Sequence, residues 1–183
     1  MNILLFGISN VGKSVTASLL ASQLGCAFYD LDDEVKKHMN TTLETFVHTG
    51  TLEFRDSIRV HVMEKIIHLP EAKVFSICPI SYSEYYHHLL DRQDIFAIEL
   101  QDLPEHIFER LVFSNEHDEL YHDIDYKYEH IDRILLEISS DIEYYNQCFS
   151  KIEHKFFMNN DAPEQVVERL IKDYQLTHLL NKS

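Results

Sequence analysis

Residues 7–14 read GISNVGKS and carry the strongest chemical signal in the chain. They follow an apolar run at 3–6 and precede an amphipathic segment at 15–24, so the motif lies between an expected strand and an expected helix. In this context G-x-x-x-x-G-K-[ST] is typical of a P-loop, in which glycines let successive backbone N–H groups face one concavity. The helix that follows adds the positive end of its dipole. The stretch therefore predicts a cradle for the phosphates of a nucleotide.

The side chains of this loop have separate expected roles. Lys13 is placed to reach the β- and γ-phosphates of ATP, and the Ser14 hydroxyl is placed to bind Mg²⁺. The alternative, a chance string in a loop, is disfavoured by the flanking strand and helix. The residues assigned to phosphate binding are Gly7, Asn10, Val11, Gly12, Lys13, Ser14 and Val15.

A cluster of acids at 30–33 (DLDD) follows residues 26–29, a short expected buried strand. Ligands of open α/β sheets bind outside the carboxyl ends of the strands. Carboxylates at such an edge can hold Mg²⁺ through water, and they can hydrogen-bond or deprotonate a substrate hydroxyl. The same acids can instead cap the helix that begins near Glu34. Position alone leaves both interpretations open.

The elements that must position these groups alternate along the chain between strand-like and helix-like segments. This alternation predicts an α/β fold, a parallel sheet with helices on both faces. After residues 26–29, further strands are expected at 73–77, 94–100 and 155–158, and helices at 51–68, 81–92, 104–113 and 164–174.

Composition limits the partners of the chain. Its 183 residues, 45% hydrophobic and 26% charged, suffice for one sizeable core, so we expect a single domain over 1–183. A formal charge of -15 argues against nucleic acid and anionic membranes as partners and favours a small molecule. We find no signal peptide and no stretch long enough to cross a membrane. The three widely spaced cysteines suit reduced thiols, so we expect a cytoplasmic protein.

These motifs and those that follow them resemble the shikimate kinase family in content, order and spacing. Residues 30–35 (DLDDEV) match its D-x-D after the second strand, and residues 50–55 (GTLEFR) resemble its G-E-x-x-F-R signature, with Thr51 in place of the glutamate. The resemblance implies a three-layer P-loop sandwich of the nucleoside monophosphate kinase type, with a five-stranded parallel sheet. It also implies ATP-dependent phosphorylation of a hydroxyl of shikimate or a similar small polyol acid, a reaction of aromatic amino acid biosynthesis, with Mg²⁺ as cofactor.

The resemblance further implies roles for individual residues. Asp30 helps to order the Mg²⁺ shell with Ser14, and Asp32 contacts the ring hydroxyls and is the candidate proton acceptor. Arg55 pairs with the substrate carboxylate, which its planar fork suits. Arg110 and Pro163 lie on opposite sides of the adenine. The sequence leaves open a surface ion pair for Arg55, a structural role for Arg110 and a helix-starting role for Pro163.

The chain departs from the family at the acceptor loop and the lid. Where the family has three glycines after its third strand, residues 78–80 read CPI, so the acceptor pocket must differ in shape. The expected lid at 114–146 has ten acids, its only basic residues are Lys127 and Arg133, and it lacks the family's lid arginines. Cations assist phosphoryl transfer, so we expect Lys127 or Arg133 to move toward the phosphates, or a second metal ion to bridge the acids to the phosphates. If neither happens, we expect catalysis to be slow.

Two hypotheses of different class follow. The first is a monomeric enzyme in which Lys13 stabilises the transferring phosphoryl group and Asp32 positions or deprotonates the acceptor hydroxyl. A variant of it is a kinase for a different small alcohol. The second is a catalytically weak nucleotide-binding protein that uses ATP occupancy to set its lid for a protein partner.

Overall fold

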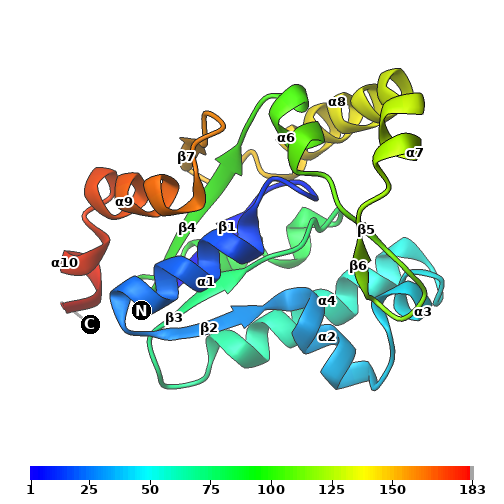
Figure 1. Ribbon diagram of the computed structural model, residues 1–183. Coiled ribbons are helices and arrows are strands. Elements are labelled where there is room, and N and C mark those ends of the chain that lie inside the picture. Colours follow the sequence, from blue (N-terminus) through cyan, green and yellow to red (C-terminus); the bar gives the residue numbers. More distant parts are fainter. Residues whose placement is uncertain (182–183) are drawn as a thin grey trace.

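A computed structural model describes residues 1–181 and shows an α/β architecture (Figure 1). Its main sheet has five parallel strands in the order β2-β3-β1-β4-β7. The predicted five-stranded parallel sheet is therefore confirmed. The strands are β1 (Asn2–Phe6), β2 (Ala27–Asp30), β3 (Lys73–Ser76), β4 (Ile95–Gln101) and β7 (His154–Phe157).

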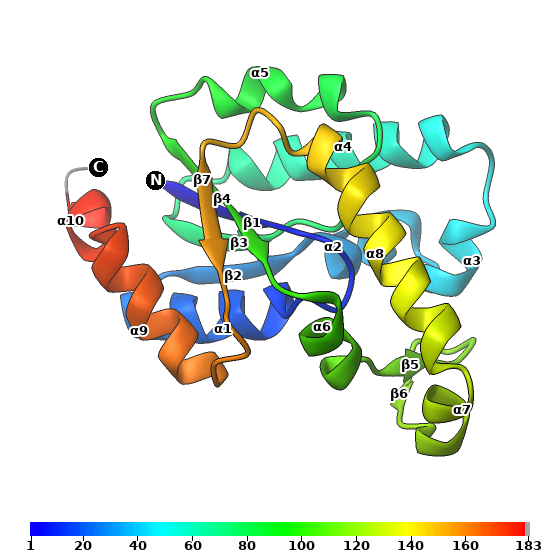
Figure 2. The same cartoon turned by 90° about the horizontal axis from the view of Figure 1, so that it is seen from above.

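Helices cover both faces of this sheet. Figure 2 shows α1 and α9 on one face and α4, α5 and α8 on the other, which gives the expected three layers. None of the helices within residues 1–181 is both long and apolar enough to span a bilayer. The helices are α1 (Lys13–Leu24), α2 (Leu31–Met39), α3 (Leu43–Val47), α4 (Leu52–Ile67), α5 (His87–Leu90), α6 (Pro104–Arg110), α7 (Ile124–Glu129), α8 (Ile131–Cys148), α9 (Pro163–Asp173) and α10 (Leu176–Asn181), with a 3₁₀ turn η1 (Ser83–Tyr85).

The core is centred on β1, whose residues are all buried. A strand covered on both faces needs an uninterrupted apolar run, which residues 3–6 supply. Phe6 stacks on Tyr86 and meets Phe149 edge-on, and the Tyr86 hydroxyl donates to the Cys148 carbonyl at 2.9 Å. The strand that leads into the P-loop is thus fixed by packing on the side of α5 and α8.

Three expected elements differ in the structure. The helix expected at 81–92 is divided into η1 and α5, and the N–H groups of Ser81 and Tyr82 before η1 are accepted by the carboxylate of Asp56. The strand expected to be buried at 26–29 is β2, an edge strand of which Phe28 is 39% exposed. The helix expected at 104–113 ends at Arg110.

The segment expected as a lid contains two kinds of structure. Its first part is a short antiparallel hairpin of β5 (Phe113–Ser114) and β6 (Leu120–Tyr121), followed by α7. Most of its second part is the long helix α8, which buries Ile134 and Ile138 against the core. The hairpin lies next to α3 in Figure 1, and in Figure 2 it lies beside α7 at the end of α8.

Candidate active site

The P-loop connects β1 to α1 with a backbone that only glycine accommodates at two positions. Gly7 has φ +146°, and a Cβ there would lie 2.7 Å from the Leu100 carbonyl oxygen. Gly12 has φ +110° and is the N-cap of α1, where a Cβ would lie 3.1 Å from the Met158 Cε. Because Gly12 offers no capping side chain, the first N–H groups of α1 remain available to an anion.

The Lys13 side chain is folded back over this loop and is 8% exposed. Its ammonium donates to the Ile8 carbonyl at 2.7 Å. Burial lowers the pKa of Lys13, while Asp32, Cys78 and Asp30 oppose that shift. The structure therefore brings the predicted phosphate-binding lysine and the predicted acidic residues into one electrostatic cluster.

Asp30 links the P-loop to the acidic segment. The Ser14 hydroxyl donates to Asp30 Oδ2 at 2.6 Å, and Asp30 Oδ1 accepts the Asp32 N–H at 3.0 Å as the N-cap of α2. One side chain thus fills the capping role and also holds the predicted Mg²⁺-binding hydroxyl. Within residues 1–181 no group of three or more His, Cys, Asp or Glu side chains is arranged to hold a metal ion. A hydroxyl and a carboxylate fit Mg²⁺, which keeps several waters and is completed by substrate phosphates.

Asp32 is partly buried at the first turn of α2. Desolvation and the charge of Asp30 raise the pKa of the Asp32 carboxyl, while Cys78, Lys13 and Arg59 lower it by less. Carboxyl groups with raised pKa in a cleft are candidates for proton transfer. The raised pKa is compatible with proton transfer by Asp32, a role that stays a prediction of the family resemblance.

The two arginines on α4 occupy different positions. Arg55 Nη1 donates to the carbonyls of Gly50 at 3.1 Å and Thr49 at 3.4 Å, which holds the turn before the helix. Arg59, one helical turn later, is the arginine whose charge lowers the pKa of Asp32. Sequence reasoning missed Arg59, although the spacing of four residues from Arg55 places both on one face of a helix.

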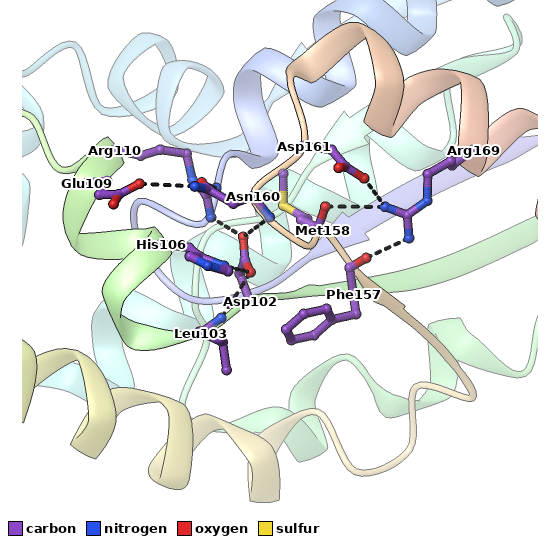
Figure 3. A network of polar contacts seen from close by, with 10 residues as sticks. All are labelled: Asp102, Leu103, His106, Glu109, Arg110, Phe157, Met158, Asn160, Asp161 and Arg169. Atoms are coloured by element: carbon purple, nitrogen blue, oxygen red, sulfur yellow. Dashed lines mark hydrogen bonds and ion pairs between the residues drawn. The ribbon is translucent and has the colours of Figure 1, made fainter.

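Arg110 lies against the loop that leads into α9 (Figure 3). Its Nη2 donates to Asp102 Oδ2 at 2.6 Å, and its Nη1 donates to Asn160 Oδ1 at 3.0 Å. His106 Nδ1 lies 2.6 Å from the other oxygen of Asp102. Pro163 is the first residue of α9. The structural roles that the sequence left open for Arg110 and Pro163 are thus both present, and the adenine-binding roles stay predictions.

Arg169 holds the opposite side of that loop, as Figure 3 shows. It forms an ion pair with Asp161 and donates to the carbonyls of Phe157 at 2.9 Å and Met158 at 3.3 Å. Sequence reasoning missed this arginine because its spacing to the loop has no motif. The loop is therefore clamped from α6 and from α9.

We expect Asp102→Asn to lower the free energy of unfolding by about 3 kcal/mol, because it leaves Arg110 beside a buried neutral group. Burial opposes ionisation of Asp102, but hydrogen bonds from His106, Arg110 and the Leu103 N–H outweigh it and lower the pKa of Asp102. The stabilisation is therefore present above the unfolded pKa and lost as pH falls through the lower folded pKa. Urea unfolding of both proteins from pH 7 to pH 3 measures the difference.

Asp94→Asn is the matched control for this change. Asp94 pairs with Arg92 at 2.8 Å, but its side chain is 46% exposed. Exposed pairs of this kind contribute at most about 1 kcal/mol. Equal losses in the two variants would contradict a special role for the Asp102 cluster.

The two basic residues of the expected lid, Lys127 and Arg133, each form a hydrogen bond with a residue of α6 or α7. Lys127 donates to the Glu109 carbonyl at 2.9 Å and lies over the Phe108 ring, and burial lowers its pKa. Arg133 donates to the Tyr126 hydroxyl at 2.6 Å. Arg133 also lines a cavity of about 210 Å³ together with Asn10 of the P-loop. Of the two, Arg133 is therefore placed closer to the expected phosphate site.

An acid of the hairpin, Asp118, ties it to the N-terminal helices. Its carboxylate accepts the N–H of Leu43 at 2.8 Å and of Glu44 at 3.4 Å, which caps α3, and Lys36 Nζ lies 3.9 Å away. Sequence reasoning counted this acid only as a source of repulsion. At the start of a helix a carboxylate is favourable, because it satisfies free N–H groups and the helix dipole.

We expect Asp118→Ala to release the hairpin from α3 and to lower the free energy of unfolding by about 1 kcal/mol, the usual cost of a lost helix cap. Hydrogen exchange of the Leu43 and Glu44 amides should accelerate in parallel. Glu116→Ala is the control, because Glu116 lies in the same hairpin with its side chain 80% exposed. Unchanged exchange at Leu43 in Asp118→Ala would contradict the contact.

Comparison with known proteins agrees with this geometry. A family model described as shikimate kinase matches residues 9–175. This chain belongs to the shikimate kinase family. The resemblance predicted from the motifs of the first third is thereby confirmed, and so is the fold class.

Individual relatives of this family member match shorter parts of it. A shikimate kinase of Rhizobium leguminosarum is 36% identical over 67 residues, which are 36% of this chain and 34% of that protein. The chain aligns with 5% to 41% of the length of the curated relatives it matches. Sequence similarity to individual relatives thus covers less than half of each protein.

Solved structures extend the likeness to the whole fold. The shikimate kinase of Aquifex aeolicus is 24% identical, with a TM-score of 0.70 over 98% of this chain and 99% of that one. A structure of the Acinetobacter baumannii enzyme in complex with shikimate is 16% identical, with a TM-score of 0.72 over 96% and 93% of the two chains. At these identities the likeness establishes the fold of this family member.

Proposed function

We propose that this chain is an ATP-dependent kinase that transfers the γ-phosphoryl group to a hydroxyl of shikimate or a similar small polyol acid. The observation that carries the proposal is the chain of contacts from the P-loop hydroxyl of Ser14 through Asp30 to the backbone of Asp32. The carboxyl of Asp32 has a raised pKa, and it and Lys13 act on each other's charge, which supports a site where a phosphate and an alcohol would meet. Membership in the family and a relative solved with shikimate bound support this choice of acceptor.

The phosphate side of the reaction rests on the P-loop. The backbone N–H groups at the start of α1 hold the phosphates, and Lys13 exchanges the Ile8 carbonyl for a γ-phosphate oxygen. Ser14 and Asp30 would hold Mg²⁺, which would neutralise charge on the β- and γ-phosphates. Arg110 and Pro163 enclose the adenine beside the clamped loop.

The acceptor side rests on α2 and α4. Asp32 orients the hydroxyl and takes its proton, and the raised pKa of Asp32 brings it closer to the working pH, which favours a general base. Arg55 pairs with the carboxylate after exchanging its contacts with the Thr49 and Gly50 carbonyls. Cys78 and Ile80 are buried at the end of β3, where the family has glycines, so the acceptor pocket must differ in shape from the family's.

The proposed unit is a single kinase domain with residues 114–146 as its lid. Arg133 is the lid residue that would approach the phosphates, from the cavity it shares with Asn10. We propose that the protein is a cytoplasmic monomer whose partners are ATP and one small acceptor. A charge of -15 supports the exclusion of nucleic acid and of anionic membrane surfaces.

A coupled assay of ADP release, with shikimate and a panel of neutral and acidic polyols, tests the proposal. We expect ADP release that depends on shikimate or on one acidic polyol of similar size. Release with a different alcohol would favour a kinase with another acceptor. Binding of ATP with Mg²⁺ but without acceptor-dependent turnover would support a catalytically weak nucleotide-binding protein.

A further inference from the structure

A cavity of about 200 Å³ lies behind the P-loop, between the end of β4 and the helix α8. Its P-loop wall is formed by Ile8 and Val11, which are 6% and 0% exposed, so both side chains turn into the core. The predicted phosphate cradle uses the backbone N–H groups of the same loop. The cavity and the phosphate site therefore share the P-loop but use different groups of it.

The other walls of this cavity are largely apolar and aromatic. Ile142 and Tyr145 line it from α8, and the Phe149 ring stacks on Tyr145 with the ring centroids 5.5 Å apart. Phe157 also lines the cavity, and its ring points away from Arg169 in Figure 3. Phe157 is 42% exposed, so the cavity opens to solvent beside it. An apolar cavity of about 150 Å³ is large enough to bind benzene, so this one can hold a single substituted ring.

The two acids that line the cavity already have counter-charges. Glu99 is 4% exposed, forms an ion pair with Lys155 and accepts Gln101 Nε2 at 2.9 Å. The Asp102 carboxylate pairs with Arg110 at 2.6 Å. A charged ligand would leave water without meeting a free opposite charge, which is costly. The cavity therefore favours a neutral ligand.

Two amide side chains supply the polar groups that remain for a ligand. Gln101 Oε1 and the Asn146 side chain both line the cavity, and neither has a hydrogen-bond partner among residues 1–181. An amide oxygen accepts hydrogen bonds from O–H and N–H groups. In apolar pockets a few such polar groups fix the orientation of the ligand. A ring that carries one hydroxyl meets both requirements.

We propose that this cavity is a binding site for a small neutral molecule made of one aromatic ring, whose hydroxyl donates to Gln101 Oε1. The ligand contacts Ile8 of the P-loop and Ile142 of α8 at the same time. It thereby holds α8 against the P-loop, and the α8 amides exchange more slowly when it is bound. The inference goes beyond the proposed function and holds whichever alcohol is the acceptor.

Titration of the full chain with phenol, followed by amide chemical shifts, tests the site. We expect a Kd of about 1 mM or below, within the limits for a ligand of this size, with shifts at Ile8, Gln101 and Ile142. Saturation with ADP should leave phenol binding in place, because the nucleotide site uses the other side of the P-loop. Benzoate has the same ring with a negative charge and should bind at least about tenfold more weakly.

Two substitutions of Ile142 change the cavity in opposite directions. Ile142→Phe fills it and should remove phenol binding, whereas Ile142→Ala enlarges it and should raise the affinity for naphthol relative to phenol about tenfold. Leu136→Phe and Leu136→Ala are the matched controls on the same helix, because Leu136 is 67% exposed. Circular dichroism reports whether each variant folds. Should Ile142→Phe fail to fold, the change of preference in Ile142→Ala still decides the question.

The hydrogen bond to Gln101 has a separate test. Gln101→Leu should weaken phenol about two- to tenfold, the usual net contribution of one hydrogen bond, and should leave fluorobenzene unchanged. Equal weakening of both molecules would remove the assigned donor contact. The site itself would be overturned if phenol failed to bind the wild type, if ADP displaced it completely, if benzoate bound as tightly, or if phenol bound unchanged to folded Ile142→Phe.

Discussion

Replacing Asp32 with asparagine is expected to lower kcat for acceptor phosphorylation by about 10² to 10⁴, the usual contribution of a positioned general base. ATP binding should persist, because the cradle is made by backbone groups and Lys13 on the other side of the cluster. The amide keeps the size of the side chain but cannot accept the hydroxyl proton. Steady-state kinetics and calorimetric titration with ATP and Mg²⁺ separate the two effects.

The pH dependence of kcat gives a second readout for Asp32. Desolvation and Asp30 raise its pKa, so the ionised base accumulates only as pH rises through a value above the usual one, and kcat should increase over that range. The same shift means that ionised Asp32 destabilises the fold at neutral pH, so Asp32→Asn should raise Tm while it lowers kcat. Asp33→Asn is the control, because the neighbouring Asp33 side chain is 56% exposed. A fall in both Tm and kcat would point to damaged structure instead.

Replacing Lys13 with methionine is expected to lower kcat by about 10² to 10³, the usual cost of one preorganised group that stabilises transition-state charge. The Lys13 ammonium is a buried cation of the P-loop itself, where it already donates to the Ile8 carbonyl. Binding of ADP should weaken far less than turnover, because the backbone N–H groups remain. Single-turnover kinetics with saturating ATP measures the chemical step.

The Tm of Lys13→Met shows whether a loss of kcat comes from the missing ammonium or from a damaged fold. Burial lowers the pKa of Lys13, which means that its charged form is disfavoured in the folded state. Methionine at this position should therefore leave Tm unchanged or raise it. Lys37→Met serves as the control, because the Lys37 side chain is 71% exposed on α2. A Lys13→Met enzyme with near wild-type kcat would contradict the phosphate-binding role.

The strand and the loop that position the phosphate site could be predicted, because each is determined by residues that are close together in the sequence. Residues 3–6 form a continuous apolar run, and residues 7–14 form a turn that needs glycine at two strained positions, so both have a signature in neighbouring residues. The alternation of strands and helices then fixes a parallel sheet, whose carboxyl edge collects Ser14 and Asp30.

The contacts that define the rest of the site join distant residues and have no local signature. Asp118 caps α3 from 75 positions away, and Asp56 satisfies Ser81 from 25 positions away. The second of these contacts lies at the start of the segment 81–92, where the structure has η1 and α5 in place of one helix. Arg59 was missed although its spacing from Arg55 is visible in the sequence, since only the tertiary fold shows that its charge acts on Asp32.

The roles of Arg55, Arg110 and Pro163 stay predictions of the family resemblance. Arg55 holds a turn and Arg110 holds a buried carboxylate in the structure, so each has a structural partner that a ligand would have to share or displace. Charged side chains at ligand sites commonly make such contacts before the ligand arrives. Their positions are therefore compatible with both interpretations that the sequence left open.

The most direct test of the account is a single-turnover reaction with ATP labelled at the γ-phosphate, with shikimate in excess and Mg²⁺ present. The account predicts that the label moves to a hydroxyl of shikimate and that transfer is lost in Lys13→Met. Label that stays on ATP, or that appears only as inorganic phosphate at the same rate with and without shikimate, would contradict it.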